Sequence, residues 1–288
     1  MFLFRAMAAW LEDKPDLSVW FGLLSVLTVA GLMIFINKLN LIDKISYLPA
    51  LFYILLSGGA PVIHRFNEAV IATILLIFAF TQLMTSFRSE RVSYGYFAAS
   101  ILIALATFFF RYACLFMLMV WGCILFFRTG YWREWIFSIL GFFLPFFWLF
   151  AYCYIIEDNP MRIFGIVGEI FSTSHTIPSV DLSAMIFFAV SFFTGMTTMV
   201  YLLRRVNSQK NVVRKGHYML VMTTLIILLI IFIAPCTLPQ VWYLMAFPLS
   251  FFLSYYLANT SSIRKGNIIL WLFLAGVGIV HYLYFAGQ

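Results

Sequence analysis

The chain of 288 residues has very little charge, since Asp, Glu, Lys and Arg together make up 10% of it. Soluble domains carry about 25% charged residues, so this scarcity excludes an ordinary soluble domain. Hydrophobic residues account for 64% and fall in long uninterrupted runs. Such runs suit α-helices that cross a hydrocarbon core about 30 Å thick. The composition therefore predicts an all-α, polytopic integral membrane protein.

Cysteine is also scarce, with four in the chain and no C-x-x-C pair among them. Neither a redox motif nor a zinc site is indicated, because both need closely spaced thiols. Buried thiols that pack as small hydrophobic side chains are the simpler interpretation. We therefore predict no cofactor and no metal centre built from cysteine.

Hydrophobic runs predict a helical bundle of about ten transmembrane helices. Eight of the predicted spans cover residues 18–36, 45–63, 69–87, 135–155, 184–203, 218–234, 241–258 and 267–285. The other two come from the apolar stretch 95–127, which as one helix would be about 50 Å long and too long for the bilayer. Arg111 interrupts this stretch. A charge at the bilayer centre costs roughly 3 kcal/mol on insertion scales, so we predict a tight turn at Arg111.

The basic residues are distributed very unequally between the two sides of this predicted bundle. Alternate connections carry 13 and 5 of the 18 Lys and Arg residues, and eight of the eleven acidic residues lie on the side poor in Lys and Arg. Cytoplasmic loops are enriched in Lys and Arg, so both termini are predicted to lie on the non-cytoplasmic side. The net charge of +7 follows from this bias, and no nucleic-acid partner is predicted.

The remaining segments predict a single domain. Residues 1–17 combine a short apolar stretch with Glu12, Asp13 and Asp16 and are predicted to form an amphipathic segment at the membrane interface. Residues 18–288 form one transmembrane domain, with an outer loop at 156–183 and a basic cytoplasmic loop at 204–217.

Part of the chain, residues 67–150, has a recognisable order of features. An Asn-led span from Asn67 to Phe87 is followed by a basic turn, an apolar hairpin that includes 115–127, and the segment Trp132-Arg133-Glu134-Trp135; Gly141, Leu144 and Pro145 close the stretch. This order resembles a family of uncharacterised polytopic inner-membrane proteins of Gram-negative bacteria, classed as a domain of unknown function. The resemblance implies a bacterial inner-membrane location and no particular reaction.

Several polar residues are predicted to lie at the outer ends of the spans and are candidates for ligand binding: His64, Arg65, Asn67, Glu68, Arg111 and His281. Positive charge is scarce on this side, so Arg65 and Arg111 could bind a phosphate, which the forked guanidinium suits. Alternatively, each arginine reaches water or pairs with Glu68 or a lipid headgroup. Both interpretations stay open.

Two further motifs are weak candidates. Glu157 and Asp158 could supply acid–base or metal chemistry in the long outer loop, or could be ordinary loop residues. Gly58 and Gly59 could form an unwound helix end that lines a transport cavity, or could simply end the helix. The four histidines cannot form one metal site, because His217 is predicted on the cytoplasmic side and the others on the outer side.

Three functions remain compatible with these observations. The first is a role in cell-envelope biogenesis, in which membrane lipids surround the protein and a lipid-linked phosphate binds at the outer leaflet. The second is a non-enzymatic subunit with a membrane-protein partner in an envelope or secretion complex. The third is a small-molecule transporter. No residue pattern predicts a particular catalysed reaction.

Overall fold

The computed structural model describes residues 15–37, 46–59, 68–87, 92–127, 132–156, 168, 182–233, 238–260 and 263–286. These residues form ten α-helices and two short 3-10 helices. The α-helices are α2 (Pro15–Asn37), α3 (Leu48–Gly58), α4 (Glu68–Ser86), α5 (Val92–Phe109), α6 (Met117–Phe127), α7 (Trp132–Ile156), α9 (Leu182–Arg205), α10 (Asn211–Ile233), α11 (Leu238–Asn259) and α12 (Ile263–Ala286). The 3-10 helices are η2 (Arg111–Phe116) and η3 (Val206–Ser208).

Seven of these helices are long and apolar enough to cross a membrane, namely α2, α4, α7, α9, α10, α11 and α12. Three shorter apolar segments accompany them: α3, α5, and η2 continued by α6. The chain is therefore an all-α protein with the composition of a multi-pass membrane protein.

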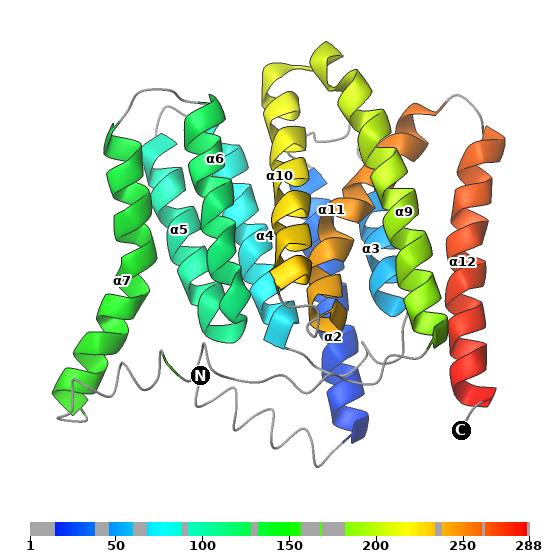
Figure 1. Ribbon diagram of the computed structural model, residues 1–288, viewed down its shortest axis with the longest axis horizontal. Helices are drawn as coiled ribbons and strands as arrows, with labels where there is room; N and C mark the ends of the chain where they lie inside the picture. The colour runs from blue at the N-terminus through cyan, green and yellow to red at the C-terminus, as the bar shows by residue number, and fades with distance from the viewer. Residues whose placement is uncertain are drawn as a thin grey trace.

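The helices run up and down and form a bundle with two distinct ends (Figure 1). At the upper end of the view, α6 is followed by α7, α9 by α10, and α11 by α12. This end carries the basic residues that flank η3, at the end of α9 and the start of α10, and we call it the basic end. At the lower end α5 turns into η2, α2 begins and α12 ends; we call it the Arg111 end.

Helix α11 lies at the centre of the bundle, and α7 and α12 lie at its two sides (Figure 1). About 83% of the α11 span is buried, against 17% of the spans of α7 and α12. Helix α11 packs against α3, α9, α10 and α4, while α7 packs mainly against α5. The central position of α11 thus sets which helices meet in the core.

The turn predicted at Arg111 is confirmed. Helix α5 ends at Phe109, Phe110 has an extended backbone (φ −127°, ψ 104°), and η2 begins at Arg111. Rings of Phe110 and Tyr112 lie 5.6 Å apart at this turn. The chain therefore reverses direction where a continuous helix would have placed Arg111 inside the membrane.

Two predicted connections differ from what the structure describes. The basic segment 204–217 is mostly helical, because α9 continues to Arg205, η3 follows, and α10 begins at Asn211. Basic side chains tolerate helical positions beyond the hydrocarbon, where they reach water or stack on rings. Lys215 does so, with its ammonium 5.2 Å from the ring centre of Phe87. Helix α2 also begins three residues inside the predicted interfacial segment 1–17, whose first 14 residues lie outside the described residues.

Candidate functional sites

Arg111 is the clearest candidate binding residue at its end of the bundle. Its guanidinium donates a hydrogen bond from Nη2 to the hydroxyl of Tyr112 at 2.7 Å, and its Cζ lies 4.7 Å from the centre of that ring. The side chain is half-buried. Among the basic side chains that the structure describes, Arg111 alone lies at this end, since the others lie at the end of α9, just before or at the start of α10, or at the upper ends of α7 and α12. The turn thus fixes a cation where cations are scarce.

His281 does not share a site with Arg111. It lies in the last turns of α12, half-buried, with its Nδ1 3.0 Å from the carbonyl oxygen of Val277 on the same helix. In Figure 1, α9, α10 and α11 lie between α12 and the turn that bears Arg111. The structure therefore separates two residues that the sequence analysis grouped together.

The other predicted ligand-binding and catalytic residues cannot be placed in this way. His64, Arg65, Asn67, Glu157 and Asp158 lie outside the described residues, and of Glu68 only the backbone at the start of α4 is described. The helix ends that flank them are described: α3 ends, α4 begins and α7 ends at the Arg111 end (Figure 1). The described helices next to these residues therefore end or begin at the end of the bundle that carries Arg111.

Gly58 and Gly59 end α3, as one of the two interpretations of this motif predicted. The space beside Gly59 is filled by Phe187 of α9, because a Cβ atom on Gly59 would lie 1.9 Å from Cε1 of that ring. A Cβ atom on Gly58 would meet no atom within 4 Å. Gly59 thus allows close contact between α3 and α9, at the point where a transport cavity had been considered.

One of the last carbonyl groups of α3 accepts a hydrogen bond from the central helix α11. The last carbonyls of a helix have no intrahelical partner. The indole Nε1 of Trp242 in α11 donates a hydrogen bond to the carbonyl oxygen of Leu56 at 2.9 Å. The same indole packs on Phe188, with ring centres 4.4 Å apart. A helix can therefore stop inside the apolar bundle without leaving this carbonyl unsatisfied.

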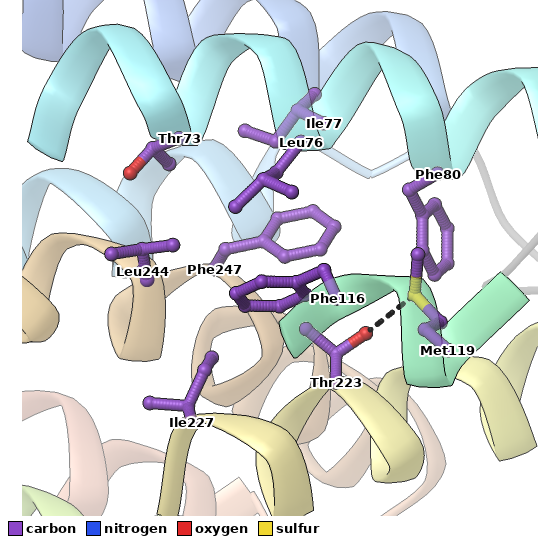
Figure 2. Close-up of a pocket in the computed structure, with 10 residues that line it drawn as sticks. All are labelled: Thr73, Leu76, Ile77, Phe80, Phe116, Met119, Thr223, Ile227, Leu244 and Phe247. Atoms are coloured by element: carbon purple, nitrogen blue, oxygen red, sulfur yellow. Dashed lines mark hydrogen bonds between the residues drawn. The ribbon is translucent and has the colours of Figure 1, made fainter. Parts of the chain in front are cut away.

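A small interior cavity lies between α4, η2 with α6, α10 and α11 (Figure 2). Its volume is about 10 Å³, close to the roughly 10–15 Å³ that one water needs. The rings of Phe116 and Phe247 lie at its centre, and the hydroxyl of Thr223 donates to the sulfur of Met119 at 3.3 Å. The same hydroxyl hydrogen is shared with the carbonyl oxygen of Met219, which lies 2.8 Å from Oγ1. The cavity is a packing gap between well-satisfied side chains, too small for a substrate.

Hydroxyl groups within the helices are mostly satisfied by their own backbone. Thr81, Ser138, Thr194, Thr197 and Thr198 each donate to a carbonyl three or four residues earlier. Such a bond satisfies the hydroxyl donor within the apolar bundle, so that no ligand is needed to accept it. These five hydroxyl groups therefore act as local helix contacts.

Two polar residues at the basic end are buried, which the sequence analysis did not predict. Glu134, in the first turn of α7, is only 1% exposed. A carboxylate in a first turn is favoured by the helix dipole, but burial is not readable from hydropathy. His217 is 2% exposed and lies edge-on to Tyr255 of α11, at 5.1 Å, while Gln209 donates to the hydroxyl of that tyrosine at 2.5 Å. These contacts join η3, α10 and α11.

A wider groove lies between α3 and α12. Its volume is about 380 Å³, and its lining is formed almost wholly by aliphatic side chains: Tyr47, Ala50, Leu51, Ile54, Leu55, Leu270 and Leu274. This volume is within the range of ligand sites, roughly 300–1,000 Å³. The groove begins at the basic end, because Tyr47 precedes the first residue of α3.

Comparison of the chain with protein-family models, with curated proteins and with solved structures finds no match.

Proposed function

We propose that the chain is a multi-pass protein of the bacterial inner membrane that acts in cell-envelope biogenesis, by binding a lipid-linked anionic intermediate at the outer leaflet. The observation that supports this proposal is the placement of Arg111. Within the described part of the chain it is the single basic side chain at its end of the bundle, and Tyr112 holds its guanidinium in place. A positive group on the side that is poor in Lys and Arg suits an anionic ligand that approaches from that side.

The chemistry of a phosphate suits this arrangement. A guanidinium presents a planar fork of N–H donors that matches phosphate oxygens, and its charge persists at all physiological pH values. Stacking on Tyr112 orients the fork before a ligand arrives, which lowers the entropy lost on binding. A phosphate attached to a lipid would reach Arg111 from the adjoining leaflet without leaving the membrane.

Other residues complete the proposed site. Arg65, in the segment between α3 and α4, is the second proposed phosphate ligand, and Glu157 and Asp158, which follow α7, are proposed to supply acid–base or metal chemistry. The helix ends that flank these segments lie at the same end of the bundle as Arg111, so the proposed ligands share one side of the bundle.

Native mass spectrometry of the full chain in mild detergent tests this proposal. The unmodified protein should retain a polyprenyl-phosphate-like lipid, and the double variant Arg65→Ala/Arg111→Ala should lose it. Arg133→Ala, which removes an exposed arginine at the basic end, serves as the matched control and should retain the lipid. Equal lipid retention in the two variants, or a protein that carries no such lipid, would contradict the proposal.

A second candidate function is that of a membrane subunit held by a partner protein. Helix α7 contains Pro145, and in Figure 1 its lower part diverges from α5 and stands apart from the bundle. This part exposes large aromatic side chains on several faces, including Phe147, Trp148 and Tyr154. A stable protein that co-purifies with the unmodified chain but not with Trp148→Ala would favour this function over lipid binding.

A further inference from the structure

The groove between α3 and α12 is amphiphilic along its length. Its body is lined by leucine, isoleucine and alanine side chains of both helices. Its outer end, at the basic end of the bundle, has Tyr47 on the α3 side, and this residue is 68% exposed. Tyrosine prefers such positions, where the ring contacts apolar groups and the hydroxyl reaches the headgroup region.

Helix α12 also changes from polar residues at its start to apolar residues further along the groove. Arg264, Asn267, Leu270 and Leu274 follow one another at spacings of three or four residues, so that successive members are neighbours on the helix surface. Arg264 and Asn267 are exposed, whereas Leu270 and Leu274 line the groove. The amide of Asn267 therefore stands about one turn, and the charge of Arg264 nearly two turns, from the apolar part towards the start of the helix.

The dimensions of the groove suit part of an acyl chain. From Tyr47 to Leu55 the α3 side extends about 12 Å along the helix axis, which is less than half of a hydrocarbon core about 30 Å thick. The groove therefore stays within the leaflet at the basic end. Exposed Leu51 and Ile54 leave it open on the outward face, from which a lipid tail can enter.

We propose that this groove binds one anionic phospholipid of the leaflet at the basic end, with an acyl chain along Leu51, Ile54 and Leu274 and its phosphate near Arg264. The charge of Arg264 selects an anionic headgroup, and the apolar lining holds the tail. This site is independent of the proposed ligand of Arg111, because the two lie at opposite ends of the bundle.

Titration of the full chain in detergent with phosphatidylglycerol or phosphatidylcholine, followed by native mass spectrometry, tests this site. One phosphatidylglycerol should bind more tightly than phosphatidylcholine. Leu51→Trp/Leu274→Trp should fill the groove and weaken binding of the tail roughly tenfold or more, since each buried methylene contributes to the binding of an acyl chain. Leu27→Trp/Leu272→Trp, at two exposed leucines outside the lining, should leave binding unchanged.

The headgroup contact has its own test, which does not disturb the packing. Arg264→Gln should lower the affinity for phosphatidylglycerol to that for phosphatidylcholine, and Arg204→Gln, an exposed arginine on α9 at the same end, should not. Equal affinity of the unmodified chain for both lipids overturns the proposal, as does full binding by the groove-filling variant. A dimer that this variant dissociates would make the groove an interface between copies and would also overturn it.

Discussion

At the residue scale, α3 and α9 meet through a contact between a glycine and a ring. Gly59 has an ordinary helical backbone, with φ −73° and ψ −5°, so its small size and not its flexibility is what the position uses. Phe187 fills the volume that a Cβ atom would take, and its ring also lies edge-on to Phe273 of α12 at 6.4 Å. One ring thus links α3, α9 and α12.

Gly59→Ala should destabilise the protein by about 1–3 kcal/mol, the usual cost of forcing extra volume into a packed core. Gly58→Ala is the matched control, since its Cβ atom would meet nothing within 4 Å. Thermal unfolding in detergent should show a lower midpoint for the first variant only. In a Phe187→Leu background the same Gly59→Ala change should cost less, and an unchanged cost there would reject this contact as the cause.

The hydrogen bond from Trp242 to Leu56 leads to a second residue-scale prediction. Trp242→Phe keeps a ring against Phe188 but leaves a buried carbonyl without its donor, which costs about 1–3 kcal/mol. Trp121→Phe is the control, because Nε1 of Trp121 is buried and has no hydrogen-bond partner within the described residues. The thermal midpoint should fall for Trp242→Phe and stay level or rise for Trp121→Phe. Equal losses in both variants would mean that ring volume, not the hydrogen bond, matters.

At the element scale, α5 and α7 approach each other through Gly141. A Cβ atom there would lie 2.5 Å from the carbonyl oxygen of Phe97 and 3.1 Å from Cβ of Ser100. A backbone carbonyl cannot rotate away as a side chain can, so a larger residue must displace the helix. Small residues at such crossings are the usual means of close packing between membrane helices.

Gly141→Ala should therefore weaken the attachment of α7 to α5. Alanine normally stabilises a helix interior by up to about 1 kcal/mol relative to glycine. A lower free energy of unfolding in Gly141→Ala would therefore show that the close contact outweighs this gain. Gly278→Ala on α12, where nothing lies within 4 Å, should show the ordinary gain. Hydrogen exchange measured by mass spectrometry should accelerate in α7 of the first variant. Unchanged exchange in α7, with a gain in stability, would exclude the proposed contact.

Helix positions could be predicted from the sequence because apolar runs and their interruptions decide them. The break at Arg111 and the bounds of α9 within two residues follow from local composition. Helix α3 ends at Gly58, inside a span predicted to reach residue 63, and only one of the two interpretations of the glycine pair anticipated this end. The arrangement of the helices could not be predicted in this way. Helix α11 has the lowest mean hydropathy of the seven long helices, 1.4, and yet the most buried span, while α7 has 2.0 and is mostly exposed. Lipid is as apolar as the core, so hydropathy does not distinguish the two surroundings.

The candidate site was less predictable than the helices for a related reason. Contacts such as Trp242 with Leu56 join residues that are 186 positions apart. The charge count grouped Arg111 and His281 because both were predicted on the outer side. Two residues on the same side of the membrane can still lie far apart across the bundle. Their separation across the bundle depends on helix order, which the sequence of apolar runs does not contain.

At the scale of the whole molecule, the alternation of helices gives a definite topology. The start of α2 and the end of α12 lie at the same end of the bundle, and η3 with its flanking basic residues lies at the opposite end (Figure 1). The charge bias of the connections predicts that the basic end faces the cytoplasm. An epitope inserted after Ser208, an exposed residue of η3, should therefore be protected from antibody in intact spheroplasts.

The same epitope placed after Gln288 should be accessible in intact spheroplasts, because the end of α12 is predicted to lie outside. Permeabilised spheroplasts, in which both epitopes should react, serve as the control for expression. An accessible Ser208 epitope together with a protected Gln288 epitope would show that the orientation is the opposite of the predicted one. Arg111 would then lie at the cytoplasmic leaflet, where an outer-leaflet ligand could not reach it. Equal accessibility of both would mean that α12 or another helix does not cross, because the two positions lie at opposite ends of the bundle.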